Sequence, residues 1–161
     1  MSETRWLNAE EQAAWRSYLT FTRVLATQLD RDLQRESNIP HPYYEILVRL
    51  SESESHRARM SELADASDSS RSRLSHAVAR LEDAGWIRRE SCPTDRRGSF
   101  AVLTDEGMAA LSAAAPGHVA SVRRYLFDHL TAEHVRQLRE ITEAALSGMR
   151  DHGHGLSLIH I

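Results

Sequence analysis

Apolar residues in the N-terminal part of the chain recur at the spacing of an amphipathic helix. Asn8 and Glu11 have the spacing of a capping box, which predicts that a helix begins there. The apolar stripe that follows has intervals of three and four residues and consists of Trp15, Tyr18, Leu19, Thr22, Leu25, Leu29 and Leu33. We therefore predict a helix over residues 8–37 that ends before the two prolines of residues 39–42. A second helix is predicted over residues 43–50.

The middle of the chain has shorter elements. In chain order, the pattern predicts a strand over residues 57–60, a helix over 62–66 that Ser61 begins, a helix over 69–84 that Gly85 ends, and two strands over 86–90 and 99–103. Two short helices followed by a hairpin have the order of a DNA-binding unit, in which one helix enters the major groove and the hairpin lies along the backbone.

The loop between the last two strands carries Asp95, Arg96, Arg97 and Gly98. We expect the glycine to permit a turn and the two arginines to lie at its tip, where they cannot pack into a core. The carboxylate of Asp95 can pair with one arginine, which leaves the other to contact a phosphate or the minor groove. A solvated loop is the alternative for an isolated pair of arginines, but here the pair directly follows two candidate DNA-binding helices.

The C-terminal part of the chain is again helical. Thr104 begins one helix, which we expect Pro116-Gly117 to interrupt or kink, and Thr131 begins the last. The pattern ends near residue 150, and we expect residues 151–161 to form a flexible tail. Residues 1–150 are therefore predicted to form one domain. Its long helices at both ends carry more apolar surface than one small core can bury, which favours a symmetric homodimer.

Composition and charge narrow the function classes. The 161 residues include one cysteine and have no segment with the pattern of a membrane span or a secretory signal, so we expect a cytoplasmic protein without disulfides. The net charge of −3 argues against non-specific coating of nucleic acid. Residues 57–100, however, contain nine arginines against seven acidic residues, which leaves −5 for the rest. A weakly basic segment on an acidic body is compatible with selective DNA binding.

The helix over residues 69–84 has two different faces. Its apolar face consists of Leu74, Ala77, Val78 and Leu81, and its polar face of Ser69, Ser72, Arg73, His76 and Arg80. Serine hydroxyls near the start of a recognition helix can contact base edges or phosphates, and arginine can donate two hydrogen bonds to guanine. Taken alone, the polar face is equally well explained as the solvated side of an amphipathic helix. The hairpin that follows favours the DNA-binding interpretation.

These residues resemble the MarR-type winged helix-turn-helix regulators, over roughly residues 14–146. The resemblance rests on Met60-Ser61-Glu62-Leu63-Ala64, Ser70-Arg71-Ser72-Arg73-Leu74-Ser75, Arg80-Leu81-Glu82, Gly85-Trp86-Ile87, Asp95-Arg96-Arg97-Gly98 and Leu103-Thr104-Asp105-Glu106-Gly107. It implies a mainly α fold with a small β-wing, in which a winged helix-turn-helix lobe (43–103) lies between dimerisation helices (8–37 and 104–150). The Pro116-Gly117 pair departs from a long straight dimerisation helix.

The resemblance implies a homodimeric transcriptional regulator, a ligand-responsive repressor that binds double-stranded DNA at a palindromic operator. The DNA contacts would then be Ser69, Ser70, Ser72, Arg73, His76 and Arg80 on the recognition helix and Arg96 and Arg97 on the wing, with Asp95 orienting the wing. The alternative is a ligand-binding or protein-interaction module with the same fold and weak DNA affinity. A small hydrolase or redox enzyme is a more distant alternative.

Regulation by a ligand or an oxidant would require residues that bind the ligand or react with the oxidant, in addition to the DNA contacts. By the resemblance, a small aromatic ligand would bind between the dimer interface and the lobe, where Trp15, Tyr18, Tyr43 and Tyr44 are candidates. Their alternative role as core and interface aromatics is favoured, because Trp15 and Tyr18 lie on the apolar stripe. Cys92 lies near four arginines, which can lower the pKa of a thiol, so it is a weaker candidate for a redox sensor.

Metal and catalytic motifs are missing from the sequence. None of the nine histidines has the paired spacing with cysteine or carboxylate that is typical of a zinc site. The chain has no glycine-rich phosphate loop, no Gly-x-Ser-x-Gly and no His-Glu-x-x-His motif. We therefore expect a protein that is not an enzyme and needs neither a metal nor a cofactor.

Overall fold

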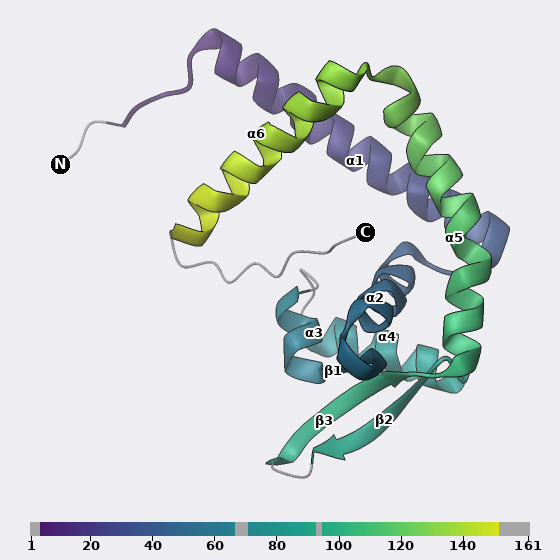
Figure 1. Cartoon of the computed structure of the whole chain (residues 1–161). Helices are drawn as coiled ribbons and strands as arrows, with labels where there is room; N and C mark the ends of the chain where they lie inside the picture. Colours follow the sequence, from purple (N-terminus) through teal and green to yellow (C-terminus); the bar gives the residue numbers. More distant parts are fainter. Residues whose placement is uncertain (1–3, 67–70, 93–94, 152–161) are drawn as a thin grey trace.

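The molecule consists of a helical frame and a smaller lobe below it in Figure 1. The computed structural model describes residues 4–66, 71–92 and 95–151. The frame contains α1 (Ala9–Ser37), α5 (Asp105–Tyr125), η2 (Phe127–His129) and α6 (Ala132–Asp151). The lobe contains α2 (His41–Glu52), η1 (Glu54–His56), β1 (Arg57–Arg59), α3 (Met60–Ala66), α4 (Arg71–Asp83), β2 (Ile87–Cys92) and β3 (Asp95–Leu103). The predicted fold class, mainly α with a small β-wing, is confirmed.

Local sequence signals set the helix ends as predicted. The side chain of Asn8 accepts a hydrogen bond from the N–H of Glu11 at 2.9 Å, and the carboxylate of Glu11 accepts one from the N–H of Asn8 at 2.8 Å. This capping box begins α1. After α4, Gly85 has a φ of 76° and donates its N–H to the carbonyl of Glu82 at 2.9 Å. Glycine adopts this left-handed conformation without strain, so the helix ends where predicted.

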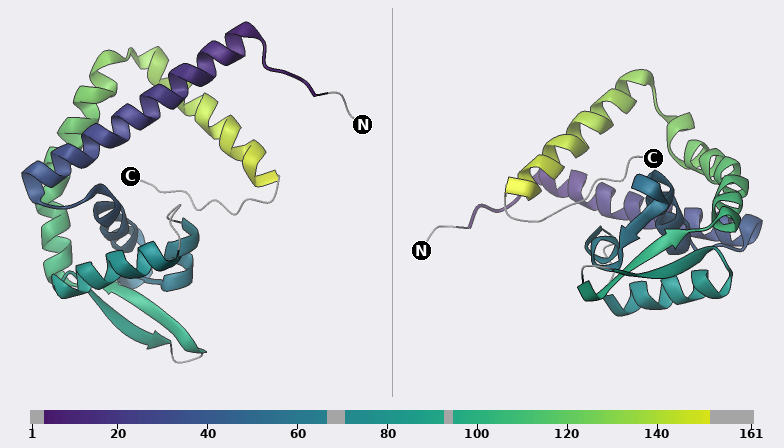
Figure 2. Two further views of the ribbon diagram at one scale, coloured as in Figure 1. Left: turned by 180° about the vertical axis from the view of Figure 1, so that it is seen from behind. Right: turned by 60° about the horizontal axis from the view of Figure 1, so that its bottom comes forward.

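The core of the lobe lies between its helices and one face of the sheet. It is formed by Leu47 and Leu50 of α2, Leu63 of α3, Leu74, Val78 and Leu81 of α4, Ile87 of β2 and Ala101 of β3, all nearly inaccessible to solvent. Because each element contributes to this one cluster, the orientation of α4 relative to the sheet is fixed by packing. Figure 2 shows α4 running beside the β2–β3 hairpin in two further views.

The sheet has three antiparallel strands in the order β1-β3-β2. Pairing between β2 and β3 shifts register between Ser91 and Cys92, so that Cys92 lies opposite Asp95. β3 therefore begins at Asp95, and the prediction that residues 95–98 belong to a long loop is wrong. Strand pairing with β2 overrides the poor intrinsic strand propensity of aspartate and glycine here. We call the β2–β3 hairpin the wing.

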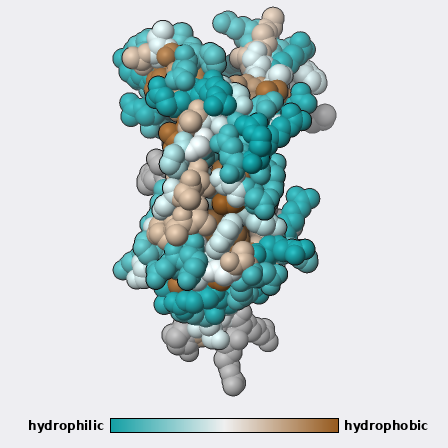
Figure 3. Space-filling view, turned by 90° about the vertical axis from the view of Figure 1, so that its right-hand side faces the viewer, coloured by the Kyte–Doolittle hydropathy of each residue, from teal (hydrophilic) through white to brown (hydrophobic). Residues whose placement is uncertain are grey.

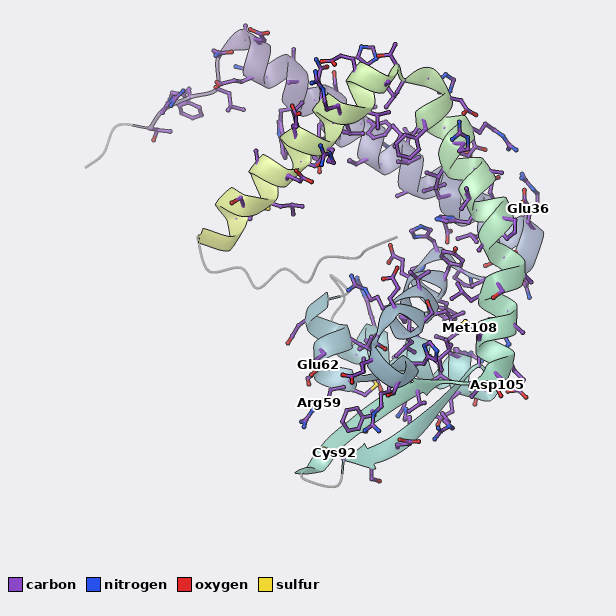
Figure 4. All side chains as sticks on the ribbon, in the orientation of Figure 1. Glu36, Arg59, Glu62, Cys92, Asp105 and Met108 are labelled. Atoms are coloured by element: carbon purple, nitrogen blue, oxygen red, sulfur yellow. The ribbon has the colours of Figure 1, made fainter. Side chains whose placement is uncertain are left out.

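α5 continues through Pro116 without a break, so the predicted interruption at Pro116-Gly117 is wrong. An internal proline removes one helical hydrogen bond, but α5 packs against both α1 and α2, and this packing offsets the cost. Gly117 contributes space: a Cβ there would lie 2.7 Å from a carboxylate oxygen of Glu36. Figure 4 shows Glu36 at the end of α1, beside α5. An added methyl group would therefore displace the carboxylate of Glu36, a flexible side chain that is partly exposed.

A buried carboxylate joins α1 to α5. The side chain of Asp32 is 4% exposed and accepts hydrogen bonds from the hydroxyls of Ser121 at 2.8 Å and Tyr125 at 2.9 Å. Arg35 forms an ion pair with it at 2.8 Å, and Arg124 lies 3.9 Å away. The hydrogen bond from Ser121 and these neighbours hold the pKa of Asp32 below its usual range despite burial. Asp32 therefore stays ionised and fixes the angle between the two helices.

Replacing Asp32 with alanine is expected to lower the free energy of unfolding by about 2 kcal/mol, because the buried Ser121 hydroxyl and the Tyr125 hydroxyl lose their acceptor. The ion pair with Arg35 adds little, since the arginine is 64% exposed. Urea denaturation near neutral pH measures the effect. The exposed Asp83→Ala is the control and should change stability by less than about 0.5 kcal/mol. Equal effects of both substitutions would contradict the role of Asp32.

The helical frame leaves large apolar side chains exposed. Trp15, Tyr18, Leu19 and Val24 of α1 and Val135, Ile141 and Met149 of α6 are 38–67% exposed. Figure 3 shows hydrophobic residues among hydrophilic ones on the surface, including its upper part. None of the described helices combines the length and the apolar character that crossing a membrane requires.

Candidate nucleic-acid interface

α4 has the two faces that its sequence predicts. Leu74, Val78 and Leu81 are at most 2% exposed and belong to the core of the lobe. On the polar face, Ser72, Arg73, His76 and Arg80 are all exposed. The predicted contacts Ser69 and Ser70 lie outside the described residues. The structure therefore brings four of the six predicted helix residues to one exposed surface.

The wing residues Asp95, Arg96 and Arg97 lie at the start of β3, beside the end of the hairpin. For these three residues the structure describes the backbone. Their position is close to the predicted one, but they belong to β3: Asp95 lies opposite Cys92, and Arg96 and Arg97 lie in the irregular part of the pairing between Asp95 and Ser99.

Arg89 and Glu82 tie the wing to α4. The carboxylate of Glu82 lies 3.3 Å from Nε of Arg89 and also accepts the backbone N–H of Arg89 at 3.2 Å. Nη2 of Arg89 donates to the carbonyl of Ser75 at 3.3 Å. Sequence reasoning missed this link, although two opposite charges on either side of the turn at Gly85 are a signal that could have indicated it. The link joins the wing to α4.

The other face of the sheet carries arginines packed on an aromatic ring. The guanidinium of Arg57 lies 4.0 Å from the centre of the Phe100 ring, and that of Arg59 lies 5.4 Å away. Glu90 pairs with Arg88 and, at 3.8 Å, with Arg57. This charge balance makes the second face of the sheet less positive than its arginine content suggests.

The four aromatic residues predicted to line a ligand pocket fall into two groups. Trp15 and Tyr18 stack on α1 with ring centres 6.0 Å apart, whereas Tyr43 and Tyr44 lie on α2. A groove between α1 and α6, with a volume of about 760 Å³, is lined by Leu7, Glu11, Ala14, Trp15, Tyr18, Ile141, Thr142, Ala145, Leu146 and Met149. Within one chain, this groove includes Trp15 and Tyr18 but neither tyrosine of α2.

A buried histidine lies where α5 meets the lobe. His118 is 7% exposed, and its ring centre lies 4.6 Å from that of Tyr44 and 5.6 Å from that of His41. Its Nδ1 has no hydrogen-bond partner among the described residues. Burial, with a smaller contribution from His41, lowers the pKa of His118, and burial raises the pKa of Tyr44. His118 is therefore neutral in the folded protein near neutral pH.

Stability is expected to fall as the pH decreases below about 6.5, the pKa of histidine in an unfolded chain. Because the folded pKa of His118 is lower, only the unfolded state binds the proton in this range, so acid favours unfolding. Above about pH 6.5 both states are neutral and the full stability remains. Urea denaturation at several pH values measures the slope. His118→Gln should reduce it, whereas the exposed His129→Gln should not; equal slopes for wild type and His118→Gln would contradict this explanation.

Cys92, the proposed redox sensor, is 6% exposed at the end of β2 (labelled in Figure 4). An oxidant-sensing thiol needs access to solvent, so this burial does not favour the hypothesis. Among residues 4–66, 71–92 and 95–151, no group of three or more His, Cys, Asp or Glu side chains could hold a metal ion.

The chain is similar to known proteins in both sequence and structure. A model of the MarR family matches residues 39–99, which span α2 to the wing. The chain is 54% identical to Sco3205, a MarR family transcriptional regulator from Streptomyces coelicolor whose crystal structure was determined in complex with DNA; the match covers 92% of both chains with a TM-score of 0.85. AbsC, another MarR family transcriptional regulator from S. coelicolor, is 48% identical over 92% of this chain and 99% of its own, with a TM-score of 0.82.

Curated relatives match over shorter stretches. The HTH-type transcriptional regulator PecS of Dickeya dadantii is 36% identical over 80 residues, which are 48% of this chain and 48% of PecS. The transcriptional regulator HosA of Escherichia coli O111:H- is 43% identical over 54 residues, which are 34% of this chain and 40% of HosA. The chain thus spans less than half the length of each of these two relatives.

Proposed function

The chain belongs to the MarR family, and from this premise we propose that it is a homodimeric, sequence-specific DNA-binding transcriptional regulator. The observation that carries the proposal is the exposed polar face of α4, held at a fixed angle to an arginine-bearing wing. The protein of known structure with 54% identity was crystallised with DNA, which supports the same role here. The proposal does not assign an enzymatic activity, a metal or a cofactor.

In this proposal, α4 contacts base edges and the wing contacts the DNA backbone. Ser69, Ser70, Ser72, Arg73, His76 and Arg80 are the contacts of the recognition helix, Arg96 and Arg97 are those of the wing, and Asp95 orients the wing. Guanidinium groups on α4 suit guanine, because they can donate to O6 and N7 together. Arginines at the wing suit phosphates or a narrow minor groove.

We further propose that the second copy of the chain covers the exposed apolar side chains of α1 and α6. A monomer that exposes Trp15, Tyr18 and Ile141 at 51–67% leaves apolar surface in water that association would bury. Two lobes related by a two-fold axis would then contact two half-sites, which predicts a palindromic operator. Residues 8–37 and 104–150 would supply the dimerisation helices.

We also propose that the protein is a repressor and that it releases its DNA when a small aromatic ligand binds. Trp15 and Tyr18 are candidates because they line the groove between α1 and α6, and Tyr43 and Tyr44 because α2 joins the lobe to the frame. A ligand screen by thermal shift, followed by release of bound DNA, tests this part. A ligand that raises the melting temperature and releases DNA would support it, and stabilising ligands that leave the DNA bound would contradict it.

The experiment that tests DNA binding is an anisotropy titration with the DNA beside the protein's own gene, across a salt series. The proposal predicts nanomolar affinity and a loss of at least about 10³-fold between about 50 and 200 mM salt, because bound phosphates release counterions. A scrambled duplex of equal length is the control. Absent or salt-independent binding would favour the alternative, a ligand-binding or protein-interaction module with the same fold.

A further inference from the structure

We propose that a crease between α3, α4 and the wing holds one backbone phosphate of the DNA, with Arg89 as the residue that binds it. The crease has a volume of about 330 Å³ and is lined by Met60, Ser61, Ala64, Leu74, Ser75, Arg89 and Ser99. This inference rests on the proposed DNA-binding function and adds a contact that neither the polar face of α4 nor the tip of the wing supplies.

The polar side chains that line the crease are hydrogen-bond donors. Ser61 comes from α3, Ser75 from α4 and Ser99 from β3, and all three line the crease together with Arg89. Among the described residues, none of the three hydroxyls has a hydrogen-bond partner. Among the side chains that the structure describes, no carboxylate lines the crease. One cation with three hydroxyl donors is a set that suits a phosphate oxygen.

Two acidic side chains, one on α3 and one on α4, already have hydrogen-bond or ion-pair partners. The carboxylate of Glu62, on α3, accepts the backbone N–H of Arg59 at 3.0 Å, and Figure 4 labels both residues beside β1. The carboxylate of Glu82 is bound to Arg89 itself. Neither group lines the crease, although the carboxylate of Glu82 offsets part of the positive charge of Arg89.

Arg89 is oriented before any DNA binds. Glu82 holds its Nε at 3.3 Å, and the carbonyl of Ser75 accepts from Nη2 at 3.3 Å. A guanidinium has five N–H groups, so both protons of Nη1 and one of Nη2 remain for a phosphate. The side chain is 36% exposed, which leaves it accessible. Glu82 is thus the positioning residue, since it fixes both the backbone and the guanidinium of Arg89.

The position of the crease fits the path of a duplex. α4 lies on one side of it, and the wing lies on the other. If α4 contacts the major groove and the wing contacts the neighbouring minor groove, the strand that separates these grooves must pass between them. The phosphates of that strand then lie over the crease. A phosphate held there would fix the register in which α4 contacts the bases.

The test is a coupling experiment between Arg89 and individual phosphates. Duplexes in which one phosphate per half-site is replaced by an uncharged methylphosphonate are titrated with wild type, Arg89→Gln and Arg88→Gln. Arg88 is the matched control, because it is the adjacent residue of β2 and pairs with Glu90. Ser61→Ala is a second variant that removes one donor without disturbing the link to Glu82. Thermal unfolding checks that each variant is folded.

The expected result is one methylphosphonate position that weakens wild type and Arg88→Gln by about tenfold. Arg89→Gln should bind unmodified DNA about tenfold more weakly and show no further loss at that position. Ser61→Ala should show a reduced loss there. Equal losses for wild type and Arg89→Gln at every position would overturn the inference while leaving the proposed function intact. A wild-type protein that binds no duplex would overturn both.

Discussion

Replacing Gly107 with alanine is expected to lower the free energy of unfolding by about 3 kcal/mol. Gly107 lies in the first turn of α5, and its N–H donates to the hydroxyl of Thr104 at 3.0 Å. A Cβ there would lie 2.1 Å from the carbonyl oxygen of Trp86 and 2.8 Å from a methyl group of Leu103. That carbonyl accepts the N–H of Thr104 at 3.0 Å, so it cannot move away without loss of this bond.

The matched control for this substitution is Gly85→Ala, in the same lobe. Gly85 has a left-handed φ of 76° but no atom within 4 Å of an added Cβ, so alanine should cost only about 1 kcal/mol. Urea denaturation measures both variants. A cost for Gly107→Ala no larger than that for Gly85→Ala would contradict the predicted clash with the carbonyl of Trp86.

Replacing Arg96 and Arg97 together with alanine is expected to weaken binding about 100-fold on every duplex, whatever its sequence. A dimer loses four positive charges at its two wings, so the dependence of log Kd on log salt should become shallower by about 3 to 4. Both arginines lie at the start of β3, directly after Asp95, which lies opposite Cys92 of β2. Anisotropy titrations across a salt series measure both quantities.

The control for the wing is Arg31→Ala, an exposed charge of α1 in the helical frame. It should leave the affinity and the salt dependence nearly unchanged. A double wing variant that keeps the salt dependence of the wild type would contradict the backbone-contact role of Arg96 and Arg97.

Sequence predicted those features of the fold that depend on neighbours along the chain. The capping box of Asn8, the end of α4 at Gly85 and the two faces of α4 all follow from local spacing, and the structure has them. Helical periodicity is sufficient to separate buried from exposed residues once a helix is correctly identified. The sequence alone was therefore sufficient to predict that Ser72, Arg73, His76 and Arg80 share one exposed surface.

Features that depend on distant contacts were not predictable in this way. The hydrogen bond between Asp32 and Ser121 joins residues 89 positions apart. The continuity of α5 through Pro116 depends on packing against α1 and α2, which a local rule for proline does not include. The start of β3 at Asp95 depends on pairing with β2, and the crease around Arg89 requires three separate elements. In each case contacts between distant parts of the chain determine the local structure, because tertiary packing can override the intrinsic propensity of a residue.

The central claim is that the polar face of α4 discriminates between bases. It is tested most directly by selecting preferred sequences from a random duplex library with wild type, Arg73→Ala and the double wing variant. We expect wild type and the wing variant to select the same palindromic sequence, and Arg73→Ala to lose preference at one position of each half-site, where discrimination falls about 10-fold or more. An unchanged selection profile for Arg73→Ala, together with a changed profile for the wing variant, would contradict the account.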